Sequence, residues 1–195
     1  MPLDKSFLSQ VANRIATPHY APAAGEASIL TVAAGSFGFR STSCEQELTM
    51  PTGFDPTVAA LFECIVEAAY LVATADGVFD EAERGAFHHV VLEACRGAVT
   101  TEQLQALFSD LNDQFKEDGL DKRIQMIART VRRAEHRREV IRIAALLAHV
   151  SGGVCDAERQ VMSKLASAFE LDPSEVDAVL QEAHDTLSAA NARGA

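Results

Sequence analysis

The sequence predicts an all-α protein, a compact bundle of about seven or eight helices. Three observations support this prediction: apolar residues recur at helical spacing, a helix-turn-helix pattern occurs twice, and capping residues precede the apolar runs. Hydrophobic residues make up 48% of the 195 residues, as in chains that bury a core. We divide the chain into an N-terminal extension, residues 1–53, and a helical domain, residues 54–190.

The N-terminal extension is predicted to hold one short helix and little other regular structure. Asp4 is placed to cap an amphipathic helix that ends before Pro18. Beyond Pro18 the composition shifts to Ala, Gly, Ser and Pro. The apolar runs 29–32 and 37–39 flank small residues there, so we expect a short irregular segment or a hairpin.

In the helical domain, capping residues mark where each predicted helix begins. An Asp or Thr with a free side-chain oxygen satisfies the first main-chain N–H groups of a helix, and Pro is favoured directly after it. The apolar run from Lys122 to Val150 is long for a globular helix, so we expect a break near Ala134. The predicted caps are Asp55, Asp80, Thr100, Asp156 and Asp172.

The most distinctive segment is an acidic turn at residues 70–84. An apolar helix runs into Gly77, which tolerates the left-handed conformation that ends helices. Asp80 and Glu83 are three residues apart and form an Asp version of the capping box. Together with Asp76 and Glu81, they place four carboxylates in one turn.

The acidic turn belongs to an internal repeat. Residues 68–80 align with residues 144–156, and both copies read as helix, Gly, apolar residue, Asp and helix. If the two helix-turn-helix units face each other, their turns meet at one end of the bundle. The second copy is degenerate, because Gly152 stands where the first has Asp76.

Two interpretations of the acidic turn remain open. In the first, the carboxylates only cap helices. In the second, they bind a hard divalent cation, calcium or magnesium, which would offset the repulsion that raises carboxylate pKa values. A standard EF-hand is excluded because Val72 and Thr74 stand at two of its ligand positions. The candidate ligands are Asp76, Asp80, Glu83, Asp156 and Glu158.

Charge and composition narrow the class of protein. The net charge of −11 argues against nucleic-acid binding. Basic residues gather at 122–142, either to pair with the protein's own acidic helices or to dock an anionic partner. The start of the chain lacks signal-peptide features and no apolar stretch is long enough to span a bilayer, so we expect a cytoplasmic protein. The four cysteines are widely spaced and are expected to be structural thiols.

No catalytic motif is visible, so we expect a protein that is not an enzyme. The six histidines show neither HExxH nor another paired ligand spacing, and His149 is expected to be a buried, hydrogen-bonded residue. There is no nucleophile elbow, P-loop or dinucleotide-binding glycine motif.

The motifs at residues 71–83 and 165–175, together with the repeat, resemble the TerB-like family of tellurite-resistance proteins. The resemblance covers about residues 54–188. It implies a compact all-α fold and a metal-linked or stress-response role, often near membrane-associated complexes, and implies no catalytic reaction. The family's acidic turn maps onto Asp76, Gly77 and Glu83, whereas in the second copy Glu158 comes one residue early.

Three functions are therefore weighed. The first is a non-enzymatic stress-response module that binds a protein partner, for which a membrane-associated complex is one candidate. In this function the acidic turn contacts a cation or the partner. The second is a metal-dependent hydrolase, which needs two cations about 4 Å apart. The third is a structural helical adaptor, in which the carboxylates only cap helices.

Overall fold

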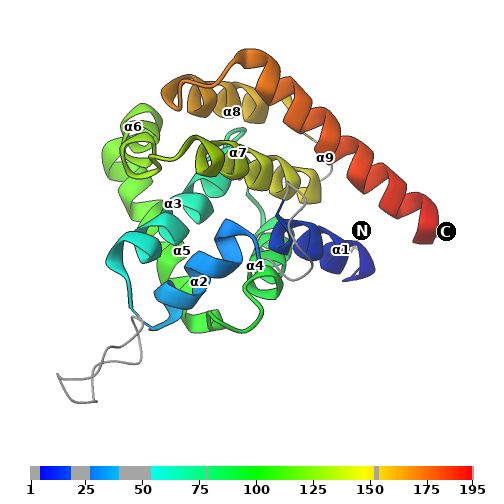
Figure 1. The fold of residues 1–195 in the computed structure, drawn as a ribbon, viewed down its shortest axis with the longest axis horizontal. Coiled ribbons are helices and arrows are strands. Elements are labelled where there is room, and N and C mark those ends of the chain that lie inside the picture. Colours follow the sequence, from blue (N-terminus) through cyan, green and yellow to red (C-terminus); the bar gives the residue numbers. More distant parts are fainter. Residues whose placement is uncertain (1–4, 19–26, 40–53, 78, 152–153, 195) are drawn as a thin grey trace.

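Helix α3 (Pro56–Ala73) lies at the centre of the structure, and the other helices are arranged around it (Figure 1). The computed structural model describes residues 5–18, 27–39, 54–77, 79–151 and 154–194. Within these ranges the chain is helical and has no β-strand, which confirms the predicted all-α fold.

Nine α-helices and one short 3-10 helix are present in the described residues. In chain order they are α1 (Lys5–Ala16), α2 (Ile29–Phe39), α3 (Pro56–Ala73), α4 (Glu81–Ala94), α5 (Thr101–Asp118), α6 (Leu120–Thr130), α7 (Ala134–Ala148), η1 (His149–Ser151), α8 (Asp156–Ala168) and α9 (Pro173–Gly194).

The core forms where α3 and α7 pack together. In α7 every residue from Val140 to Ala148 is buried, so this half of the helix is enclosed on all sides. α3 contacts α2, α6 and α8 as well as α7, and its largest buried side chains are Phe62, Ile65 and Leu71. Burial of this apolar surface is the main stabilising contribution to the fold.

In contrast to the expectation from the sequence, α3 is long and apolar enough to cross a membrane by length and composition alone, and 61% of the relevant stretch is buried inside the protein. A central helix of a bundle passes the same test, because a helix enclosed by its neighbours is apolar on all faces.

Four of the five predicted caps, Asp55, Asp80, Thr100 and Asp172, lie at helix starts. Asp55 accepts hydrogen bonds from Thr57 N and Val58 N, at 2.8 and 3.3 Å, and Pro56 is the first residue of α3. Asp172 accepts a hydrogen bond of 2.8 Å from Ser174 N at the start of α9. The expected break near Ala134 is also confirmed, since α6 ends at Thr130 and α7 begins at Ala134. These starts depend on side chains that bond to main-chain groups a few residues away.

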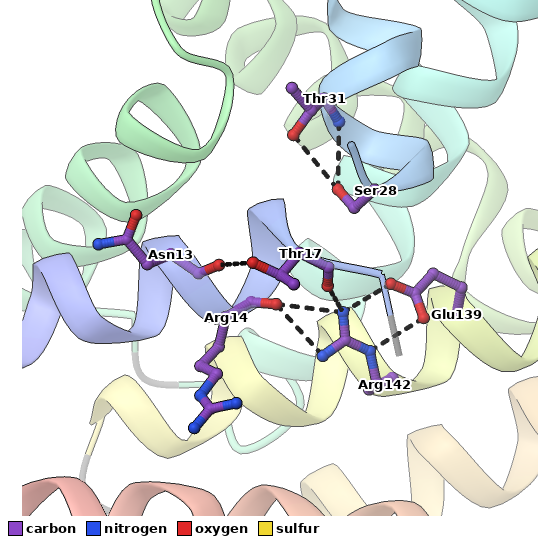
Figure 2. Close-up of polar contacts among 7 residues, drawn as sticks. All are labelled: Asn13, Arg14, Thr17, Ser28, Thr31, Glu139 and Arg142. Atoms are coloured by element: carbon purple, nitrogen blue, oxygen red, sulfur yellow. Dashed lines mark hydrogen bonds and ion pairs between the residues drawn. The ribbon is translucent and has the colours of Figure 1, made fainter. Parts of the chain in front are cut away.

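The hairpin that we expected near residues 29–39 is not formed, because this segment is the helix α2. Its buried residues Leu30, Ala33, Ala34 and Phe37 follow helical spacing and pack against α3. The helix has a serine at its start, and Ser28 Oγ accepts a hydrogen bond of 3.3 Å from Thr31 N (Figure 2).

The first helix, α1, forms as predicted, although its expected cap, Asp4, lies outside the described residues. Its C-terminal end is held by α7. The Arg142 guanidinium donates hydrogen bonds to Arg14 O and Thr17 O and pairs with Glu139 (Figure 2). A cation is favourable at the carbonyl end of a helix, so this contact fastens α1 to the central helices.

A second buried charge cluster joins α3 to α6. Arg123 of α6 pairs with Glu67 in the middle of α3 and with Asp118 at the end of α5. The side chains of Arg123 and Glu67 are 8% and 6% exposed, so each needs the other as its counter-charge.

Candidate functional site

The first hinge connects α3 to α4 and contains the acidic turn. α3 ends at Ala73, and Gly77 has a positive φ of 79°. Gly77 N donates a hydrogen bond of 3.1 Å to Thr74 O, and the Thr74 hydroxyl donates one of 2.9 Å to Tyr70 O. The chain reverses here because glycine adopts this backbone conformation without strain.

Asp80 and Glu83 form the predicted capping box at the start of α4. Glu83 N donates a 2.8 Å hydrogen bond to Asp80 Oδ1, and Asp80 N donates a 3.1 Å hydrogen bond to Glu83 Oε2. The capping interpretation of these two residues is thus observed directly. These bonds use one oxygen of each carboxylate.

The second hinge connects α7 to α8 through η1. Our prediction that Asp156 caps α8 is wrong by one residue, because Cys155 occupies the cap position and Asp156 is the first helical residue. Glu158 fixes this start, since its Oε2 accepts a hydrogen bond of 2.8 Å from Cys155 N. The glycine pair of this hinge lies outside the described residues.

The structure brings the two hinges together. η1 contacts α4, and α8 packs against α3, so that the connection from α3 to α4 lies beside α8 (Figure 1). Burial raises the pKa of Glu158, its hydrogen bonds with Cys155 lower it, and the nearby charges of Asp76 and Glu83 raise it further. We call the carboxylates of Asp76, Glu83 and Glu158 the acidic pole.

The other two candidate ligands lie at the margin of the acidic pole. Asp80 and Asp156 are both exposed, and neither is among the charges that shift the pKa of Glu158. Within the described ranges, no group of three His, Cys, Asp or Glu side chains is arranged to hold a metal ion. Repulsion acts over several ångströms, whereas shared ligands must lie about 2.0–2.6 Å from one ion, so binding here requires side chains to move.

The basic residues do not form one continuous stripe, because the break before Ala134 divides them between α6 and α7. Several pair internally, as one of the two interpretations predicts. Arg138 lies 2.7 Å from Glu175, and Arg137 donates hydrogen bonds of 2.9 Å to both Val131 O and Phe169 O. These arginines connect α7 with the α8–α9 region.

The histidine and cysteine predictions are met in part. His149 Nδ1 lies 2.8 Å from Ala145 O, although the side chain is only partly buried. Burial raises the thiol pKa of Cys64 and of Cys95 to about 12, so both are inert structural residues. Cys155 differs from the prediction, because it is exposed at the start of α8.

Comparison with known proteins supports the resemblance inferred from the sequence. A family model described as Tellurite resistance protein TerB matches residues 64–181, more than half of the chain. The match begins within α3 and ends within α9, so it includes both hinges and leaves out α1 and α2. No curated protein and no solved structure matches the chain.

Proposed function

Since this chain belongs to the tellurite resistance protein TerB family, we propose that it is a non-enzymatic stress-response module that binds a protein partner in the cytoplasm. A divalent cation, calcium or magnesium, is held at the acidic pole and takes part in that contact. A membrane-associated complex is a candidate for the partner, in line with the resemblance to the family.

The observation that carries the cation proposal is the mutual repulsion of carboxylates from two separate hinges. Asp76 and Glu83 come from the first hinge and Glu158 from the second. Burial is the main cause that raises the pKa of Glu158, and the two nearby negative charges raise it further. A hard cation offsets such repulsion, because calcium and magnesium are bound by carboxylate oxygens. Asp80 and Asp156 flank the pole and supply further oxygens after modest side-chain rotation.

The capping bonds limit how strongly the cation is bound. Glu83 and Glu158 each use one oxygen to cap a helix, which leaves the second oxygen of each for a ligand role. Because the ligands are not arranged in advance, part of the binding free energy is spent in ordering them. We therefore expect a weak site that also stiffens the two hinges.

Calorimetric titration with calcium, magnesium, manganese and zinc tests the cation proposal. Wild type should bind calcium or magnesium with one-to-one stoichiometry, whereas Asp76→Asn and Glu158→Gln should bind markedly less. Glutamine keeps an oxygen for the capping bond, so Glu158→Gln removes the charge and preserves the helix start. Asp110→Asn is the matched control, because Asp110 is an exposed acid on α5. Equal binding by all four proteins, or none by wild type, rejects the site.

The partner proposal needs a separate measurement. Cross-linking in cells followed by mass spectrometry should recover a partner with wild type that is depleted with Asp76→Asn and retained with Asp110→Asn. If the protein is only a structural adaptor, Asp76→Asn should change thermal stability while cation binding and partner recovery stay the same. If it is a metal-dependent hydrolase, the titration should show two cations per chain.

A further inference from the structure

A cavity between α4 and α5 lies apart from the acidic pole. Its volume is about 730 Å³, within the range of sites that enclose small molecules. α4 and α5 form two of its walls, and Tyr70 of α3 and Phe79 of the first hinge also line it. None of the three carboxylates of the acidic pole is among its lining residues.

One wall of the cavity is aromatic. The ring centroids of Tyr70 and Phe79 are 6.0 Å apart, and those of Tyr70 and Phe108 are 5.7 Å apart, both edge to face. Phe87 lies behind them, 5.2 Å from Phe108 and 6.0 Å from Phe79. Tyr70 and Phe108 are only 7% and 9% exposed, so the partly exposed Phe79 is the member of this rigid set on which a planar ring can pack.

Beside Phe108, neutral polar side chains of α5 also line the cavity. Gln105, Ser109 and Asn112 lie three or four residues apart and therefore share one face of the helix. Amide and hydroxyl groups both donate and accept hydrogen bonds. The charged residues Glu81 and Arg84 also line the cavity and have opposite signs, so this pair gives the site no net charge.

Gly85 gives independent support for a binding role. It lies within α4, where glycine is less favourable than alanine, and it lines the cavity. A Cβ atom built at this position meets no atom within 4 Å, and the backbone needs no positive φ. Neither packing nor backbone geometry requires glycine here. Because glycine has no side chain, a ligand can approach the main chain closely at this position.

His88 adds an unsatisfied polar group to the same wall. Its Nε2 is buried without a hydrogen-bond partner, and its ring centroid lies 5.6 Å from that of Phe108. Burial lowers the pKa of His88, which favours the neutral ring. Buried polar atoms normally have a hydrogen-bond partner, and leaving His88 Nε2 without one costs free energy. Rotation of the His88 ring towards a polar group of a bound molecule would remove this cost.

We propose that this cavity is a binding site for a small, uncharged, planar aromatic compound that carries a hydrogen-bonding group. The aromatic ring of the compound packs against Phe79, its edge lies over the Gly85 backbone, and its polar group faces the polar side chains of α5. This site is independent of the cation proposal, although Phe79 connects the cavity to the first hinge.

The test uses N-phenyl-1-naphthylamine, an uncharged fluorescent aromatic amine whose emission rises in apolar surroundings. Wild type should bind it saturably with one-to-one stoichiometry. Gly85→Leu extends into the cavity from a position where a Cβ atom meets no neighbour, and should weaken binding roughly tenfold or more. Gly35→Ala is the matched control, since Gly35 also lies within a helix with nothing near its Cβ position and does not line the cavity.

Thermal melting separates loss of the site from loss of the fold. Both glycine substitutions improve helix propensity and should raise the melting temperature by about 2–4 °C. A more stable Gly85→Leu protein that has lost the probe supports the proposal. Saturable binding that is unchanged in Gly85→Leu, or no saturable binding by wild type, overturns it. Neither result depends on whether divalent cations bind at the acidic pole.

Discussion

Both terminal nitrogens of Arg142 in α7 donate hydrogen bonds to the main-chain carbonyl of Arg14 at the end of α1, at 3.3 and 3.2 Å. The Arg142 side chain is 8% exposed, and Glu139 neutralises its charge from one helical turn earlier. The contact spans 128 residues of sequence. It joins the N-terminal segment, which lies outside the family match, to the centre of the bundle.

Replacement of this arginine should loosen α1. We expect Arg142→Met to lower the free energy of unfolding by about 2–4 kcal/mol, because it leaves two carbonyls and the poorly exposed Glu139 without their partner. Urea denaturation measures the change. Arg159→Met is the control: its ion pair with Asp177 is exposed, so it should cost less than about 1 kcal/mol. Equal losses in the two variants would contradict this account.

The buried pair of Arg123 and Glu67 should behave as one unit. Arg123→Met alone is expected to cost about 3–5 kcal/mol, because it strands the Glu67 carboxylate in the core. The double variant Arg123→Met/Glu67→Leu should recover most of that loss, since no unpaired charge then remains at this position. Denaturant melts of both single variants and the double variant give the coupling energy. Additive losses would show that the pair is not coupled.

Gly38 should not tolerate a side chain. A Cβ atom at this position would lie 1.8 Å from Ala98 O, in the connection between α4 and α5. Because the obstacle is main chain, Gly38→Ala must push α2 away and should cost about 2 kcal/mol or more. Gly35→Ala on the same helix should instead stabilise the protein by roughly 0.5–1 kcal/mol. Thermal melts of the two variants should therefore shift in opposite directions.

The charge of Glu158 should cost stability at neutral pH. Burial is the main cause that raises its pKa, so the folded state binds a proton here more readily than the unfolded state does. Protonation of Glu158 therefore stabilises the folded protein. This stabilisation is fully present below the pKa of an ordinary glutamate and is lost as the pH rises through the raised pKa of Glu158 in the folded protein. At pH 7, Glu158→Gln should thus be more stable than wild type.

The stability advantage of Glu158→Gln over wild type should shrink as the pH falls towards 4, because Glu158 then becomes protonated in wild type. Unfolding free energies of both proteins at pH 4, 5, 6 and 7 measure it. A constant difference across this range would mean that the carboxylate charge is not the cause. Glu102→Gln serves as the control, since the pKa of this exposed residue is lowered by hydrogen bonds at the start of α5.

The sequence predicted the features that depend on neighbouring residues. The capping box of Asp80 and Glu83 and the cap at Asp55 were recognisable because both partners lie within three residues of each other. The cap at Cys155 was missed, since cysteine is not a preferred capping residue and Glu158 makes the bond that fixes the helix start.

Other features depend on residues that are far apart in the chain. Nothing local distinguishes Arg142, which caps α1, from the exposed arginines near it. Helix α2 was mistaken for a hairpin because its short apolar sequence fits either structure, and its packing against α3 decides the outcome. The repeat predicted that the two hinges meet, and Glu158 does lie near Asp76 and Glu83. The positions of the individual carboxylates depend on side-chain packing that the repeat does not encode.

Paramagnetic broadening by manganese tests the central claim most directly, namely that both hinges share one cation. In ¹H–¹⁵N spectra, manganese added well below one equivalent should broaden the amide signals of Gly77, Glu83 and Glu158 together, and excess magnesium should restore them. Glu158→Gln should weaken the broadening at both hinges at once. Broadening of amide signals at one hinge alone would contradict a shared cation. Equal broadening at exposed acidic residues such as Asp110 would also contradict it.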